Sequence, residues 1–180
     1  MASDPRQVAV AEAVHLFGCL GLEFSGAVPE MENAEYGAFV SRVGRGSARF
    51  RVGKLTPKKV GMFVTVWKRA ADGSTEPFAA EDGTDLLVIT VREGQHVGQF
   101  AFPKNALVEH DIVSVEGRGG KRGFRVYPPW SATRNRQAMR TQQWQCDYFL
   151  DLHDARQIDL RRAHILYGIA QPVSAPQHGQ

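Results

Sequence analysis

The sequence has 180 residues, of which 43% are hydrophobic and 23% are charged, and these proportions are ordinary for a globular domain large enough to bury a core without disulfides or metal ions. Its two cysteines, Cys19 and Cys146, exclude a disulfide framework and a paired-cysteine zinc site and favour a reducing, cytoplasmic location. No apolar run reaches the length of a membrane span, and the N-terminus lacks the pattern of a signal peptide.

The formal net charge of +3 conceals a strong segregation of charge along the chain. There is no Asp or Glu between Tyr36 and Ala71, and there is none between Gly117 and Cys146. These two basic windows hold 16 of the 22 Lys and Arg, so that the rest of the chain carries 6 basic and 19 acidic residues. The pattern predicts a polarised surface that faces a polyanion, the alternative being two solvated strand faces whose charges scatter in space.

In chain order, the first predicted element is a helix over residues 7–20, where apolar side chains recur at helical spacing before Gly18 and Gly21. Residues 22–35 predict a loop, which contains Glu30, Glu32 and Glu35. In a nuclease core one of these glutamates could reach a metal ion, and the simpler interpretation is a solvated acidic loop.

Three strands follow, at residues 36–43, 48–55 and 60–67. Apolar and basic residues alternate along the second strand, which predicts that Arg49, Arg51 and Lys54 share one basic face.

The most distinctive stretch runs from Asp85 to Lys104 and predicts a hairpin. Residues 86–91 are almost continuously apolar, as in a strand buried on both faces, and residues 97–102 form a second strand that Pro103 ends. Asp85 immediately precedes the first strand, and Lys104 immediately follows the second.

That arrangement outlines a metal-dependent nuclease core, which places a carboxylate on one strand and a carboxylate two residues before a lysine on the next. Here Phe102 occupies the second carboxylate position and cannot bind a metal ion. We therefore expect no catalytic residue, bound metal or cofactor, and interpret Asp85, Phe102 and Lys104 as relics of a degenerate site. Asp85 is equally explained as a residue that caps the start of a strand.

The remaining chain predicts a short helical turn at 104–109, strands at 112–115 and 124–127, a helix from Ser131 or Thr133 to Leu150, and a helix at 154–167. The glycine-rich loop at 116–123 is not a P-loop, because Arg122 follows Lys121 where Ser or Thr is required. The order of elements indicates an α+β fold, a mixed sheet flanked by helices, in a single domain over 1–168 with a disordered tail at 169–180.

Basic residues around glycines and alternating with apolar residues are suited to contacting phosphates without reading base sequence. We expect phosphate contacts from Arg49, Arg51, Lys54, Lys58, Lys104, Lys121, Arg122 and Arg125. Tyr127 and Trp130 are candidates for stacking on an unpaired base.

Five blocks of sequence resemble the MepB family of small bacterial proteins: GKLTPKKVGMFVTVWKR (53–69), PF (77–78), GQFAFPK (98–104), GKRGFRVYPPW (120–130) and QAMRTQQWQCDYF (137–149). The resemblance implies a restriction-endonuclease-like core with a degraded catalytic motif and a nucleic-acid-binding role. Two alternatives stay open: a metal-dependent nuclease or phosphate-ester enzyme that uses Asp85 and Lys104, and an accessory protein of drug or stress response that binds a small anion.

Overall fold

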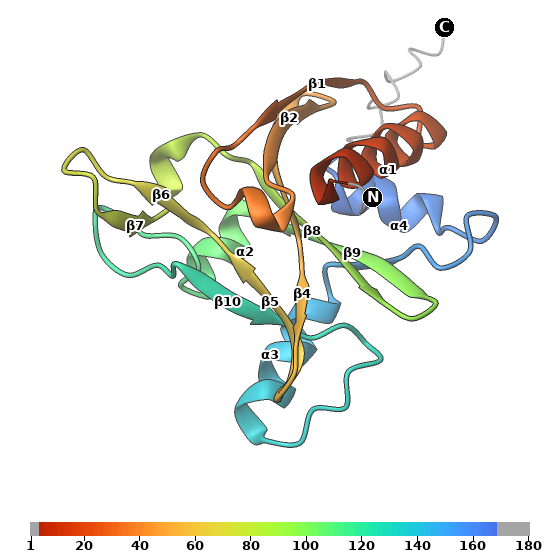
Figure 1. Cartoon of the computed structure of the whole chain (residues 1–180). Coiled ribbons are helices and arrows are strands. Elements are labelled where there is room, and N and C mark those ends of the chain that lie inside the picture. Colours follow the sequence, from red (N-terminus) through yellow and green to blue (C-terminus); the bar gives the residue numbers. More distant parts are fainter. Residues whose placement is uncertain (1–3, 169–180) are drawn as a thin grey trace, which may run out of the picture.

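The computed structural model describes residues 4–168, and its centre is a mixed six-stranded sheet (Figure 1). The strand order is β1-β2-β3-β8-β9-β11, and every neighbouring pair is antiparallel except β3 and β8. The bounds are Phe24–Pro29 for β1, Phe39–Val43 for β2, Gly46–Val52 for β3, Leu86–Glu93 for β8, His96–Pro103 for β9 and Phe149–Asp151 for β11. The predicted α+β fold with a mixed sheet and flanking helices is confirmed.

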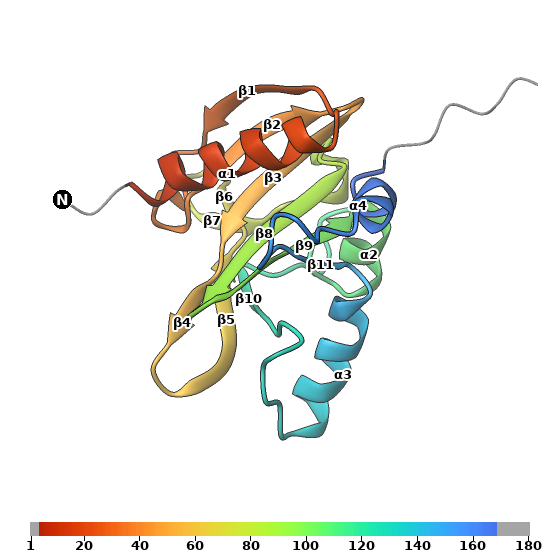
Figure 2. The ribbon, with the colours of Figure 1, turned by 90° about the vertical axis from the view of Figure 1, so that its right-hand side faces the viewer.

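Two helices, α1 (Pro5–Cys19) and α4 (Leu160–Leu166), cover one face of this sheet (Figure 2). Phe17 of α1 lies at the centre of their contact with the sheet and packs edge-on against Phe50, with ring centroids 6.1 Å apart. Tyr167, just after α4, is buried and packs against the ring of Phe17. Burial of these aromatic side chains fixes both helices on the sheet.

The opposite face carries a second layer made of a three-stranded sheet and two helices (Figures 1 and 2). The small sheet has the order β10 (Gly123–Val126), β5 (Lys59–Thr65), β4 (Lys54–Thr56), and the helices are α2 (Lys104–Glu109) and α3 (Arg136–Cys146). A separate pair of strands, β6 (Trp67–Arg69) and β7 (Thr75–Pro77), and two 3-10 turns, η1 (Ala34–Tyr36) and η2 (Ala80–Asp82), complete the described elements. The molecule therefore has three layers, with the large sheet in the middle.

The central hairpin forms as its sequence predicts. Strand β8 is buried from Leu86 to Val91 because both faces of the sheet are covered, and it pairs with β9 from Leu86 opposite Pro103 to Glu93 opposite His96. Gly94 makes the turn with φ of +59°, a conformation that glycine adopts without the steric cost of a side chain.

Some predicted boundaries were wrong for reasons that lie outside the local sequence. The expected loop at 22–35 contains β1. This edge strand is largely exposed and has a bulge, so its sequence lacks the regular alternation of apolar and polar residues that would have indicated a strand. The helix expected to reach Leu150 ends at Cys146, because the following residues pair with β9 as β11. Residues 112–115 make only isolated bridges, and the expected tail, 169–180, lies outside the described residues.

No helix within residues 4–168 is long and apolar enough to cross a membrane.

Candidate nucleic-acid interface

Asp85 and Lys104 lie side by side at one end of the β8–β9 hairpin. The Lys104 N–H donates to the Asp85 carbonyl oxygen at 3.1 Å. The Asp85 carboxylate accepts a hydrogen bond of 2.8 Å from the backbone N–H of Ser47, at the start of β3. Asp85 thus terminates two strand pairings, which is the structural role that the sequence offered as an alternative to metal binding.

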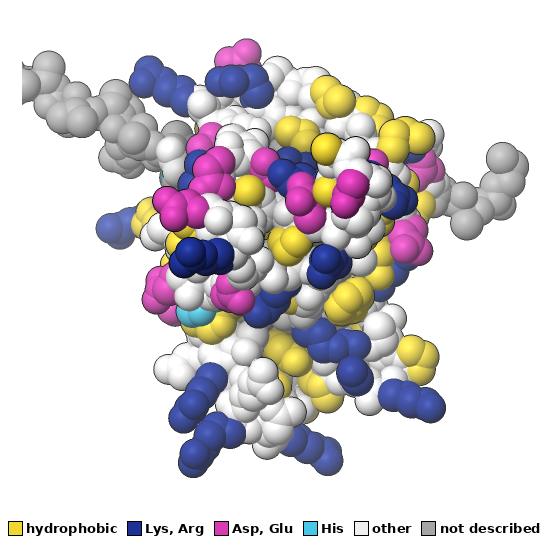
Figure 3. Space-filling model, turned by 90° about the vertical axis from the view of Figure 1, so that its left-hand side faces the viewer, with side chains coloured by type: hydrophobic (Ala, Val, Ile, Leu, Met, Phe, Trp, Pro, Cys, Tyr) yellow, Lys and Arg dark blue, Asp and Glu magenta, His cyan; other side chains and the backbone are white. Residues whose placement is uncertain are grey.

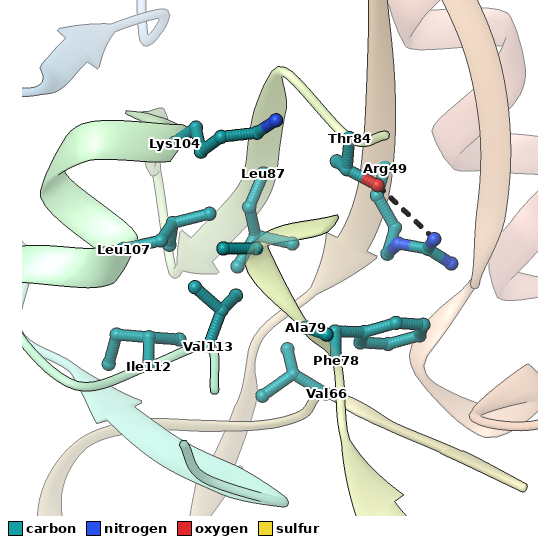
Figure 4. Close-up of a pocket in the computed structure, with 11 residues that line it drawn as sticks. Arg49, Val66, Phe78, Ala79, Thr84, Leu87, Lys104, Leu107, Ile112 and Val113 are labelled. Carbon is teal, nitrogen blue, oxygen red and sulfur yellow. Dashed lines mark hydrogen bonds between the residues drawn. The ribbon is translucent and has the colours of Figure 1, made fainter. Parts of the chain in front are cut away.

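Phe102 is fully buried and packs against Trp144 and Phe124, with ring centroids 5.3 and 6.3 Å away. The pocket beside Lys104 is lined mainly by apolar side chains, with Arg49 on its far side (Figure 4). Its volume of about 20 Å³ is room for about one water molecule. Within residues 4–168 no three His, Cys, Asp or Glu side chains gather where they could hold a metal ion.

Arg49 and Arg51 lie on one face of β3, as predicted, and both donate to Glu30, but the expectation that they are free to contact phosphates was wrong. Arg51 is 1% exposed, and its Nη1 donates to Glu30 Oε2 at 2.5 Å and to the Phe50 carbonyl at 2.8 Å. Its Nε donates to the Thr65 carbonyl at 3.0 Å. The cause is the second layer, which covers this face of β3.

Arg49 belongs to the same cluster. Its guanidinium donates to Glu30 and lies 3.8 Å above the ring of Phe78, and only 13% of its side chain is exposed. Burial lowers the pKa of Arg51 to about 9 and that of Arg49 to about 10, so both remain cationic at neutral pH. Glu30 is the acid that compensates them, and neither arginine presents a free charge to a phosphate.

The two basic windows meet where β10 pairs with β5. The register runs from Gly123 opposite Thr65 to Val126 opposite Met62. Arg125 reinforces this contact, because its Nη1 donates to the carbonyl oxygens of Val60 and Gly61 at 3.2 Å and its Nη2 bonds the Thr56 hydroxyl. Two segments that are distant in sequence thereby form one surface.

We call residues 54–65 and 118–146 together the basic lobe. The lobe contains no Asp or Glu and ten Lys and Arg, which are Lys54, Lys58, Lys59, Arg118, Lys121, Arg122, Arg125, Arg134, Arg136 and Arg140. Figure 3 shows Lys and Arg side chains on the lower part of the molecule, where α3 and the β4–β5 hairpin lie, with no acidic side chain among them on that face. Charges of one sign on one end of a molecule reinforce each other's attraction for a polyanion.

The predicted phosphate-binding side chains differ in whether they already have a partner within the protein. Lys58 is exposed at the tip of the β4–β5 hairpin. The Lys121 backbone N–H donates to the Ile112 carbonyl at 2.9 Å, and its side-chain ammonium has no hydrogen-bond or ion-pair partner among the described residues. Lys54 pairs with Glu35 at 3.3 Å, and Arg122 donates to the Thr75 carbonyl at 2.9 Å. Lys104 lines the pocket of Figure 4, and none of the residues that line this pocket belongs to the lobe.

The two predicted stacking residues also differ. Trp130 is already engaged, because its indole N–H donates to Glu93 at 2.9 Å and its ring stacks on His96 with centroids 5.0 Å apart. Tyr127 lines a pocket between β10 and α3.

This β10–α3 pocket has a volume of about 390 Å³ and is lined mostly by polar side chains, none of them acidic. Gln145, which is fully buried, fixes its two walls: its amide donates to the Arg125 carbonyl at 3.0 Å and accepts from the Tyr127 N–H at 2.8 Å. The parallel rings of His110 and Trp144, stacked 3.7 Å apart, form another wall.

Sequence reasoning missed the pocket and the arginines in and just before α3 as site residues. Arg134, Arg136 and Arg140 lie within the acid-free window, and that signal would have found them. The pocket had no such signal, since His110 and Gln145 come together only through packing.

A sequence model of the MepB-like family matches residues 30–151. The chain belongs to the MepB-like family. The crystal structure of MepB is 33% identical in sequence and superposes with a TM-score of 0.71, covering 79% of this chain and 97% of that one. No match was found among curated proteins. The resemblance expected from the sequence blocks is thus confirmed, and MepB shares the fold of this MepB-like chain.

Proposed function

We propose that this MepB-like protein binds nucleic acid without catalysis and largely without regard to sequence. The scaffold would be a degenerate restriction-endonuclease-like core. The protein would act in the cytoplasm, where its exposed Cys19 thiol would stay reduced.

The observation that carries the proposal is the joining of the two basic windows through β5 and β10. Phosphates neutralised by Lys and Arg release counterions, so such a surface gives an affinity that is independent of base sequence and falls steeply with salt. The free cations would make these contacts, with Lys58 and Lys121 from the predicted set and Arg136 and Arg140 from α3.

The geometry around Asp85 argues against hydrolysis. A Mg²⁺-dependent mechanism needs at least two oxygen ligands that converge on the ion. Asp85 is bonded to a backbone N–H, and the position where a second carboxylate is required holds the buried Phe102.

The test is direct binding of fluorescent single- and double-stranded DNA and RNA across a salt series, with and without Mg²⁺, followed by electrophoresis of the strands. We expect affinity that falls steeply with salt and strands that remain intact. Absence of binding at low salt would refute the proposal. Cleavage that requires metal and disappears in Asp85→Ala would favour the nuclease alternative instead.

A further inference from the structure

The β10–α3 pocket differs in kind from the exposed cations of the basic lobe, because it is a defined cavity. Its volume of about 390 Å³ lies at the lower end of the range for small-molecule sites. A site of that size accommodates one nucleotide and excludes a duplex. Its walls are held by Gln145, so the cavity exists before any ligand enters.

The chemistry of the lining suits an anion at one side. Lys121, whose ammonium has no partner among the described residues, lines the cavity together with the first turn of α3. There Asn135 caps the helix by accepting the Ala138 N–H at 2.8 Å, and the amides of Arg136 and Gln137 have no acceptor within the helix. Asp111 forms no ion pair with Lys121, and its carboxylate accepts the Gly120 N–H at 2.9 Å.

The other side suits a flat polar ring. The stacked rings of His110 and Trp144 provide an aromatic wall. Gln137 and Thr141 add an amide and a hydroxyl that have no hydrogen-bond partner among the described residues. These groups can pair with the edge of a base or with a sugar hydroxyl.

We propose that the pocket binds one nucleotide through a terminal phosphate monoester. A monoester carries a charge of about −1.5 to −2 at neutral pH, more than the single charge of a diester, so an acid-free cavity favours it. The ligand is either a free nucleoside 5′-monophosphate or the 5′-phosphorylated end of a strand. Binding of a strand end rests on the proposed function, whereas binding of a free mononucleotide does not.

The experiment uses the full chain and one oligonucleotide sequence, labelled at its 3′ end and made with either a 5′-phosphate or a 5′-hydroxyl. Fluorescence anisotropy at fixed salt gives the ratio of the two affinities, and competition with AMP, CMP, GMP and UMP, with inorganic phosphate as a reference, tests free nucleotides. Thr141→Phe fills the cavity without changing its charge, and Lys121→Gln removes the proposed phosphate contact. Lys58→Gln, a lobe residue outside the pocket, is the matched control.

We expect the phosphorylated strand to bind about tenfold more tightly, a mononucleotide to compete, or both. Either advantage disappears in Thr141→Phe and in Lys121→Gln, whereas Lys58→Gln weakens both strands by the same factor. If Thr141→Phe does not fold, as judged by circular dichroism, Lys121→Gln carries the test.

A wild-type ratio near one together with no competition by any mononucleotide overturns the inference, and leaves the proposed function intact if both strands still bind. An advantage that survives in folded Thr141→Phe or in Lys121→Gln also overturns it. If no strand binds, the proposed function fails, and mononucleotide binding measured directly by titration calorimetry and abolished by Thr141→Phe still supports the pocket.

Discussion

At the scale of single residues, this chain buries charged side chains in its core that its sequence pattern would place on the surface. Arg51 is among the largest fully buried side chains, and Glu30, only 15% of whose side chain is exposed, neutralises it. Removing one partner of a buried ion pair leaves an uncompensated charge in a poorly solvated environment, which costs far more than the pair itself contributes.

Glu30→Gln should therefore destabilise the protein by about 3 kcal/mol or more, because two arginines lose their counter-charge. Urea denaturation measures the change. Glu35→Gln is the matched control, since its pair with Lys54 is exposed and should change stability by less than about 1 kcal/mol. Equal effects of the two variants would show that the Glu30 cluster does not contribute as its burial indicates.

A second buried polar group, the Tyr167 hydroxyl, donates to Gln99 Oε1. Complete burial raises the pKa of Tyr167 above its usual value of 10. Above about pH 10 the unfolded chain therefore loses this proton while the folded chain keeps it. The unfolded state then binds fewer protons, so the free energy of unfolding falls as the pH rises.

Tyr167→Phe should lower stability at pH 7 by about 1 to 2 kcal/mol, since Gln99 loses its donor. It should also make the decline of stability between pH 9 and 11 shallower than in the wild type, because this titration is gone. Denaturation curves at several pH values measure both effects. The two proteins differ only at this hydroxyl, so parallel curves would contradict the role of Tyr167.

At the scale of elements, the buried Gln145 side chain connects α3 to two backbone groups at the edge of the small sheet. The Gln145 amide takes the place of a neighbouring strand by pairing with the Arg125 carbonyl and the Tyr127 N–H. The edge of the small sheet is thereby covered by a helix, which protects it from pairing with another chain.

Gln145→Ala should cost about 2 to 3 kcal/mol, because two backbone groups lose their partners and a buried amide leaves a cavity. Hydrogen exchange should accelerate at the amide of Tyr127 more than in the large sheet. Gln143→Ala, an exposed position on the same helix, should be close to neutral. If both variants unfold alike, the amide bridge does not hold α3 in place.

The elements also show which parts of the fold the sequence determines locally. The β8–β9 hairpin was predicted because its apolar runs, its turn and Pro103 are adjacent in the chain. The strand β1 and the end of α3 were not, because each depends on a partner strand that is distant in sequence. The same limit applies to the site: the acid-free windows were visible in the sequence, whereas the burial of Arg51 under the second layer was not.

At the scale of the whole molecule, one end carries Lys and Arg with no acidic neighbours, whereas basic and acidic side chains are mixed on the rest of the face in Figure 3. At physiological salt, screening limits the electrostatic reach of each charge to about 8 Å. A polyanion is therefore attracted by the cations close to it and not by the net charge of the whole protein. The position of a cation should therefore decide its effect on binding.

Two variants with the same change in net charge test this. Replacing Lys58, Lys59, Arg136 and Arg140 by Gln removes four exposed cations from the basic lobe, whereas replacing Arg42, Arg45, Arg156 and Arg161 by Gln removes four exposed cations outside it. We expect the lobe variant to bind nucleic acid at least tenfold more weakly and to reduce the slope of log affinity against log salt by up to about 3. The second variant should retain most of the affinity and slope of the wild type. Equal losses would mean that net charge, and not the joining of the two windows by β5 and β10, governs binding.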